Sequence, residues 1–150
     1  MGHIPTRLGM HGGVPRRLTD SFPRMMARAL VRRCPRCGSG GWFHHWFRRA
    51  ERCPGCGIRI ERQVGFMLGS ITVNTIVTFG LLLAVIVVGF VVSYPDVAVV
   101  PMIVVGIAIA VLFPLLFFPF SHTIWAAVDF AMRPVEPHEA EEANEALLRQ

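Results

Sequence analysis

Lysine is absent from this sequence of 150 residues, and all 15 of its basic side chains are arginine. Charge of either sign is scarce in the middle of the chain, because residues 65–131 contain no arginine and only two acids, Asp96 and Asp129. Hydrophobic residues make up 53% of the chain and charged residues only 17%, in separate segments. This segregation excludes an ordinary soluble domain and predicts a membrane protein.

Recognisable catalytic patterns are also missing. We find no Ser/His/Asp set, no paired carboxylates and no phosphate-binding loop, and we therefore expect a non-enzymatic protein without a small-molecule substrate. The first thirty residues contain no apolar run of the length that a cleavable signal peptide needs. Residues 1–20 are rich in Gly, Pro, His and Arg, which is typical of a disordered basic arm. The first membrane segment would then act as an uncleaved signal-anchor.

Two long apolar runs follow in the second half of the chain. Residues 66–93 carry no formal charge, and residues 97–120 follow after the turn-forming cluster Tyr-Pro-Asp at 94–96. About 20 apolar residues span the ~30 Å hydrocarbon core of a bilayer. The sequence therefore predicts an antiparallel hairpin of two transmembrane helices, 66–93 and 97–120. An interfacial extension to residue 132 would place Trp125 at the level of the lipid headgroups.

The arginines predict the orientation of this hairpin. Five arginines between residues 48 and 62 precede the first run and Arg133 follows the second, whereas the connecting turn has none. Positive charge beside spanning segments stays in the cytoplasm. We expect a two-span protein of the bacterial inner (cell) membrane with both termini cytoplasmic.

The segments that flank the hairpin have their own patterns. Residues 21–33 combine an apolar face with arginines at every fourth position, which favours a basic amphipathic helix on the membrane surface, and the alternative is a helix docked on the cysteine-rich segment. Residues 133–150 carry five glutamates, which predicts an acidic C-terminal tail with a short surface helix.

Small residues spaced four apart occur in both apolar runs. The pairs are Gly65 with Gly69, and Gly106 with Ala110. Such pairs let two helices approach closely, so we predict that they pack the hairpin.

Asn74 is a polar side chain inside the first apolar run, and it requires a hydrogen-bond partner there. Pro114 and Pro119 lack an N–H group, which frees the carbonyls of Ala110 and Leu115. Our hypothesis is that Asn74 binds one of these two freed carbonyls.

All four cysteines lie in residues 34–62, with the spacing C-x2-C-x15-C-x2-C. Each half also reads CPxCG, in which proline starts a tight turn and the final glycine permits a positive φ. Two such turns facing each other place four sulfurs around one tetrahedral ion. The pattern predicts a zinc ribbon of short β-hairpins, with these metal ligands: Cys34, Cys37, Cys53, Cys56.

Other uses of the thiols remain open at this stage. A rubredoxin-like iron site has similar turns, a thiol–disulfide pair needs only one CxxC, and stapling disulfides need an oxidising compartment. A site closed by four sulfurs leaves no position for water or substrate, which disfavours catalysis at the metal.

The segment between the two cysteine pairs is rich in aromatic and basic side chains, which favours partner binding. The candidate residues are Trp42, Phe43, His44, His45, Trp46, Phe47, Arg48, Arg49. Arginine with aromatics can also bind nucleic acid, and the two histidines are alternative metal ligands. A membrane tether makes nucleic acid the less favoured partner.

The chain resembles a bacterial family called domain of unknown function 983. The resemblance covers residues 30–135 and is carried by the double CPxCG, by "ERQVGFMLGSITVN" (Glu61 to Asn74) and by "FPFSHTIWAAVDFAMRP" (Phe118 to Pro134). It implies a zinc ribbon on two membrane helices. Because some members are similar in genomic setting to haem–copper oxidase assembly genes, it also implies an accessory role in a respiratory complex.

Three functions follow as expectations. The favoured one is an accessory or assembly subunit of a membrane complex, with the zinc ribbon as a protein-interaction head in contact with the lipid bilayer. The alternatives are a metal- or redox-handling protein that uses the four thiols, with iron in place of zinc, and a membrane-tethered nucleic-acid-binding ribbon.

Overall fold

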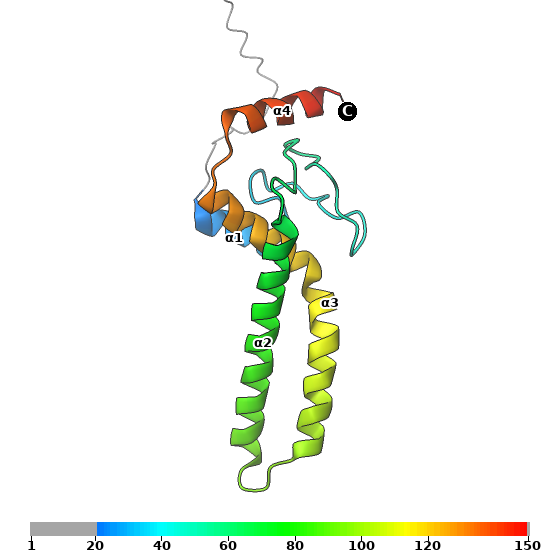
Figure 1. Ribbon diagram of the computed structural model, residues 1–150, viewed down its shortest axis with the longest axis vertical. Helices are drawn as coiled ribbons and strands as arrows, with labels where there is room; N and C mark the ends of the chain where they lie inside the picture. Colours follow the sequence, from blue (N-terminus) through cyan, green and yellow to red (C-terminus); the bar gives the residue numbers. More distant parts are fainter. Residues whose placement is uncertain (1–20, 150) are drawn as a thin grey trace, which may run out of the picture.

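The computed structural model of the chain describes residues 21–149, and the predicted basic arm, residues 1–20, lies outside this range. Four helices occur in the described part: α1 (Phe22–Leu30), α2 (Phe66–Ser93), α3 (Val99–Met132) and α4 (Pro137–Leu148). Helices α2 and α3 form a long antiparallel hairpin, and the remaining elements gather at one end of it as a head (Figure 1). Both ends of the described chain therefore lie at the same end of the hairpin.

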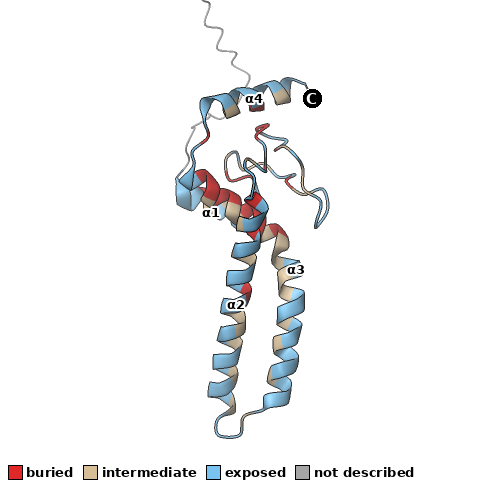
Figure 2. Ribbon diagram, viewed as in Figure 1, coloured by how far each residue is buried: buried red, intermediate tan, exposed pale blue. Residues whose placement is uncertain are grey.

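The two hairpin helices are long and apolar enough to span a membrane. Only 6% of the most apolar 18-residue window of α2 is buried, and none of that of α3. A core helix of a soluble protein would be mostly buried, whereas these two expose apolar side chains along most of their length (Figure 2). The two predicted long apolar helices are found. Helix α2 has the predicted bounds, whereas α3 begins at Val99 rather than at residue 97 and continues to Met132.

Helix α3 continues without interruption to Met132 and bends near the head (Figure 1). Pro114 and Pro119 lie inside the helix before the bend, and proline is the usual cause of such a change of direction. Beyond them the helix contributes seven buried residues to the head: Ser121, His122, Thr123, Ala126, Ala127, Asp129, Phe130. Residues 121–132 were expected as an interfacial extension, but they form the surface of α3 on which the rest of the head packs; we call this surface the floor of the head.

Helix α1 packs on this floor. Met25 and Ala29 are buried, and the hydroxyl of Thr123 donates to the carbonyl of Ala29 at 2.8 Å. The apolar face predicted for the membrane surface therefore faces α3, so α1 is docked chiefly on this helix, whereas the alternative expected docking on the cysteine-rich segment. Phe22 and Leu30 at the two ends of α1 stay about half exposed.

No strand occurs among residues 21–149, so the short β-hairpins of the predicted ribbon are not found. Two isolated antiparallel bridges, Phe43 with Arg49 and Arg52 with Arg59, are all the β pairing in this range. The backbone hydrogen bonds beside the bridges are too few for a ladder. The N–H groups of His44 and Ala50 donate to Arg48 and Trp42 at the first bridge, and those of Cys53 and Ile60 donate to Ile58 and Glu51 at the second.

Helix α4 lies across the top of the head rather than trailing as a tail (Figure 1). Glu136 and Glu139 form a capping box at its start, which satisfies backbone N–H groups of the first turn. Ala143 in its middle is fully buried. The acidic segment is thus a structural part of the head.

Candidate metal centre

The two CPxCG segments fold into the same turn. In the first, the N–H of Gly38 donates to the carbonyl of Cys34 at 2.8 Å, and in the second the N–H of Gly57 donates to that of Cys53 at 2.8 Å. Both glycines have positive φ angles, 78° and 68°, as the sequence pattern requires. We call these turns the first knuckle (Cys34 to Gly38) and the second knuckle (Cys53 to Gly57).

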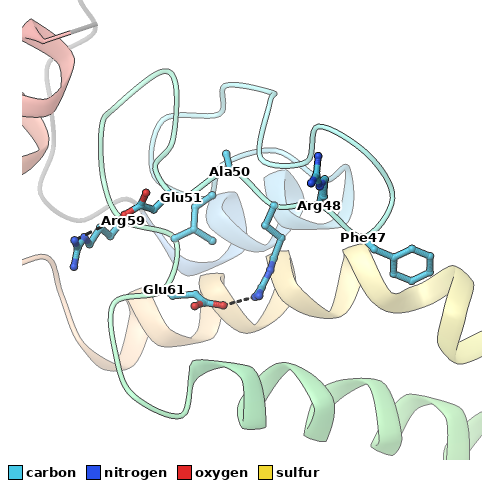
Figure 3. Close-up of a pocket in the computed structure, with 8 residues that line it drawn as sticks. Phe47, Arg48, Ala50, Glu51, Arg59 and Glu61 are labelled. Atoms are coloured by element: carbon cyan, nitrogen blue, oxygen red, sulfur yellow. Dashed lines mark ion pairs between the residues drawn. The ribbon is translucent and has the colours of Figure 1, made fainter.

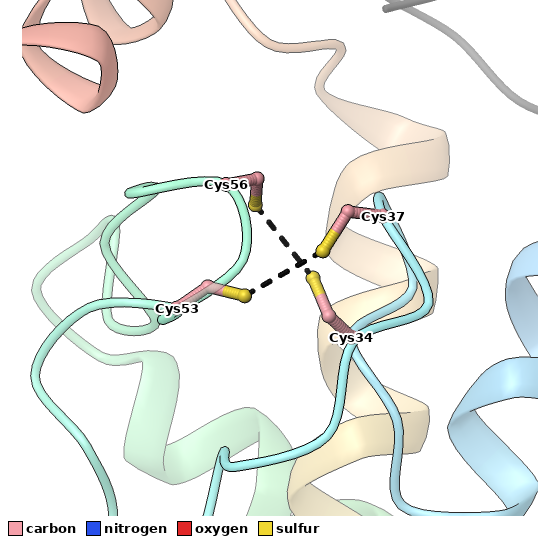
Figure 4. Close-up of side chains that lie close together, drawn as sticks. All are labelled: Cys34, Cys37, Cys53 and Cys56. Carbon is pink, nitrogen blue, oxygen red and sulfur yellow. Dashed lines mark hydrogen bonds between the residues drawn. The ribbon is translucent and has the colours of Figure 1, made fainter. Parts of the chain in front are cut away.

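The knuckles face each other and bring four sulfurs together (Figure 4). The Sγ atoms of Cys34 and Cys56 are 3.9 Å apart, those of Cys37 and Cys53 are 3.7 Å apart, and all four lie within 4.8 Å of one another. Four Zn–S bonds of ~2.3 Å in a tetrahedron require sulfurs about 3.8 Å apart. The four residues therefore fit a single tetrahedral ion bound by thiolates, as the spacing predicts.

Burial differs among the four cysteines. Cys34, Cys53 and Cys56 are buried, whereas Cys37 is exposed. The hydroxyl oxygen of Ser39 lies 3.0 Å from the Cys37 sulfur and 3.2 Å from the Cys53 sulfur. Ser39 thus provides a hydroxyl contact on the more open side of the sulfur cluster.

Hydrogen bonds among the four thiols shift their pKa values in opposite directions. Hydrogen bonds within the cluster, that of Cys34 first, lower the pKa of Cys37 to about 6 and also lower that of Cys53. Donating those bonds raises the pKa of Cys34, with Cys37 as the leading partner. Two thiolates are therefore stabilised by neighbouring thiols, and a metal that replaces the remaining protons releases them to solution.

Arginines support the backbone of both knuckles. Arg28 of α1 donates to the carbonyls of Pro35 and Arg36 at 3.1 and 2.9 Å, and Arg52 donates to the carbonyl of Gly57 at 3.2 Å. All three guanidinium nitrogens of Arg36 are buried without a hydrogen-bond partner in the described chain. These cations suit a site that carries two net negative charges when four thiolates hold a divalent ion.

Arg62 joins the segment that leads into α2 to both α3 and α4. Its guanidinium donates to both carboxylate oxygens of Glu139 at 2.9 and 2.7 Å and to Asp129 at 3.3 Å, and its side chain is only 5% exposed. It also lies over the ring of Phe130 at 5.0 Å. The sequence indicates only that Arg62 is a positive charge beside a span, because no local pattern relates it to acids 67 and 77 positions later.

His122 is a second buried residue that the sequence pattern did not single out. Its ring stacks on Phe66, packs edge-on against Phe118, and places its nitrogens 3.4 Å from Ser70 and from Arg49. The joint between the hairpin and the head therefore has an aromatic and polar centre. Nothing in the spacing of these residues predicts that they meet.

The predicted partner-binding residues divide into buried and exposed ones. Trp42 is 1% exposed and belongs to the core, so its ring cannot contact a partner. Phe43 is half-buried, and Arg49 forms an ion pair with Glu61 at 2.5 Å. The others are exposed at the surface of the head: His44, His45, Trp46, Phe47, Arg48.

The carbonyl freed by Pro119 has a partner, but that partner is not Asn74. The indole N–H of Trp46 donates to the carbonyl of Leu115 at 2.9 Å, while Asn74 donates to the carbonyl of Pro114 itself at 3.0 Å. Our hypothesis for Asn74 is therefore wrong by one residue. We call residues 39–52, between the two knuckles, the head loop. Its Trp46 binds the carbonyl of Leu115, one of the two acceptors predicted for Asn74.

The small residues of the hairpin also separate into two groups. A Cβ on Gly69 would clash with the ring of Trp125, so this glycine permits close packing of α2 against α3. Within the described chain, nothing lies within 4 Å of a Cβ at Gly65 or Gly106, and Ala110 is exposed. Of the five residues predicted to pack the hairpin, Gly69 meets α3 by its close approach to Trp125, and Asn74 meets it by its hydrogen bond to Pro114.

An opening of about 450 Å³ lies between the head loop and the segment that leads into α2 (Figure 3). Its lining mixes both charges, including Arg48, Arg59 and Glu51, and the exposed ring of Phe47 lies at one edge (Figure 3). We call it the mixed-charge opening. Its charged side chains can form ion pairs and its aromatic ring can make an apolar contact. This combination is typical of surfaces that bind another protein.

Comparisons with family models, with curated proteins and with solved structures returned no match to this chain.

Proposed function

We propose that this chain is a non-enzymatic protein with two membrane spans, whose cytoplasmic head is folded around one zinc ion and serves as the interaction head of an accessory or assembly subunit. The observation that carries the proposal is the closed set of four sulfurs at tetrahedral spacing. A site that uses all four ligands from the protein has no open position for a substrate, so its role is structural.

The membrane location is supported by the exposed apolar surface of α2 and α3. Water would make so much exposed apolar surface unfavourable, whereas lipid makes it favourable. The placement of both described ends at one end of the hairpin agrees with the arginine pattern, which favours the cytoplasm for the head. The resemblance described above favours a bacterial inner membrane and a respiratory oxidase as the complex.

The mixed-charge opening is the surface that we assign to the protein partner. Arg48 is exposed there, and Arg59 makes only a long, exposed pair with Glu51 at 3.9 Å. Such charges are available for new ion pairs, which steer association and fix its register.

A test of this role combines gentle detergent extraction with identification of the proteins that co-purify. We expect one reproducible membrane complex with the wild-type chain and its loss with Arg48→Gln/Arg59→Gln. The matched control is Arg33→Gln/Arg149→Gln, which removes the same charge from exposed positions elsewhere on the head and should keep the complex. A chain that purifies alone at native expression, or a complex that both pairs of substitutions leave intact, contradicts the proposal.

The exposure of Cys37 supports a second candidate, in which the thiols themselves handle a metal. An accessible sulfur gives an incoming ligand a place to begin exchange. This candidate predicts either bound iron, with its red absorption, or a bound metal that exchanges rapidly. The first proposal predicts a colourless zinc ion that exchanges slowly.

A further inference from the structure

A second opening of about 400 Å³ lies where the end of α1 meets the head loop. Its lining includes residues 31–33 and 40–46, with two arginines and two histidines: Arg32, Arg33, His44, His45. No aspartate or glutamate is among its described lining residues, in contrast to the mixed-charge opening. We call it the cationic opening.

The cationic opening lies at the head end of the apolar helices. The guanidinium carbon of Arg32 is 5.1 Å from the ring centre of Trp46 and 5.5 Å from that of Phe120. Phe120 is the last residue of the apolar run of α3, and Trp46 is tied to the same helix through the carbonyl of Leu115. Two aromatic rings thus hold Arg32 beside the point where the apolar surface stops.

The length of α3 gives the depth of this point. From Val99 to Phe120 the helix rises about 33 Å at ~1.5 Å per residue, against a hydrocarbon core of ~30 Å. Phe120 therefore reaches the boundary between acyl chains and headgroups, where tryptophan also concentrates. Arg32 and Arg33 come to the level of the lipid phosphates.

We propose that the cationic opening binds the headgroup of one anionic phospholipid. Arg32 and Arg33 hold the phosphate by charge-assisted hydrogen bonds, and the rings of Trp46 and Phe120 contact the glycerol and upper acyl segments. The charge of the lining selects an anion, and its position beside the apolar helices selects a lipid over a soluble anion. This inference does not depend on the protein partner proposed above.

The test measures lipid retention by the metal-loaded, full-length protein in nanodiscs that contain phosphatidylglycerol in an excess of phosphatidylcholine. Native mass spectrometry after release counts the lipids of each kind that stay bound. We expect one phosphatidylglycerol per chain and a roughly 30-fold loss of its affinity in Arg32→Gln/Arg33→Gln, which is about 1 kcal/mol for each arginine. Arg48→Gln/Arg59→Gln is the matched control and should retain the lipid.

Two further arms complete the test. Arg33 is exposed, so Arg33→Gln alone leaves the fold intact and should weaken retention roughly fivefold, even where the double substitution reduces the helical content. Inorganic phosphate is the soluble competitor and should not displace the lipid at equal concentration. Equal retention of the two lipids, equal loss in both double variants, no loss in Arg33→Gln, or displacement by phosphate would each overturn the inference.

Discussion

Gly57 occupies a position in the second knuckle where no side chain fits. Its φ angle of 68° is unfavourable for any residue with a Cβ, and a Cβ there would overlap the backbone carbonyl of Ala143 in α4. The sequence pattern predicts the positive φ, because the glycine closes a CPxCG turn. It does not predict the contact with α4, because that contact depends on how the chain returns 86 residues later.

Gly57→Ala should therefore destabilise the head by about 2–4 kcal/mol, through backbone strain and the displacement of α4. The measurement is thermal unfolding followed by the fluorescence of buried Trp42. Gly40→Ala is the control, because nothing lies within 4 Å of a Cβ there and its φ angle is not in the left-handed region. Equal midpoints for the two variants would contradict the close approach of α4 to Gly57.

Arg62 is the buried cation on which the docking of α4 depends. Arg62→Gln leaves Asp129 and Glu139 without their cation, and breaking such a buried pair costs about 3–5 kcal/mol. Hydrogen exchange should show the amides of α4 losing their protection while those of α2 keep theirs. Arg59→Gln, which breaks only an exposed pair, should change neither.

The same contact predicts how α4 responds to acid. Burial alone would raise the pKa of Glu139, but the bonds to Arg62 and the N–H of Glu136 outweigh it and lower that pKa. A carboxyl with a lowered pKa stabilises the folded form above the ordinary glutamate pKa, and this stability is lost as the pH falls through the folded value. We expect α4 amides to lose protection under acid in the wild type. A protection profile without this dependence would contradict the assigned role of Glu139.

At the scale of elements, the bend of α3 joins the hairpin to the head. Pro119 leaves the carbonyl of Leu115 without an intrahelical partner, and the indole of Trp46 supplies one. The two helices of the hairpin could be predicted from apolar length alone. Their joint to the head could not, because it depends on contacts such as Trp46 with Leu115 between residues 69 positions apart.

A double-mutant cycle tests this joint. Trp46→Phe should cost about 1–2 kcal/mol in the wild type, because it leaves a carbonyl unpaired at the edge of the apolar region. In Pro119→Ala the helix regains an N–H for that carbonyl, so Trp46→Phe should cost little, and the coupling between the sites should be about 1 kcal/mol. Hydrogen exchange of the amides of residues 42–49 measures the cost of Trp46→Phe in the wild type and in Pro119→Ala. Additive effects would show that Trp46 does not serve the carbonyl freed by proline.

At the scale of the whole molecule, the head and the hairpin share helix α3, which runs from one into the other. The clustering of the four cysteines, the two knuckles and the two apolar helices follow from local spacing and composition, which is why the sequence predicts them. The packing of α1 and α4, the absence of strands within residues 21–149 and the buried places of Arg62 and His122 depend on contacts between distant segments. A metal ion at the centre would hold together the two knuckles on which α1 and α4 rest.

The metal content of the purified full-length protein tests the central claim most directly. We predict one zinc ion per chain by elemental analysis, no visible absorption, and loss of both the metal and the buried fluorescence of Trp42 in Cys34→Ser and in Cys53→Ser. A chain that keeps a folded head with all four thiols free, or that carries iron with red absorption, would contradict a head built around a closed zinc site.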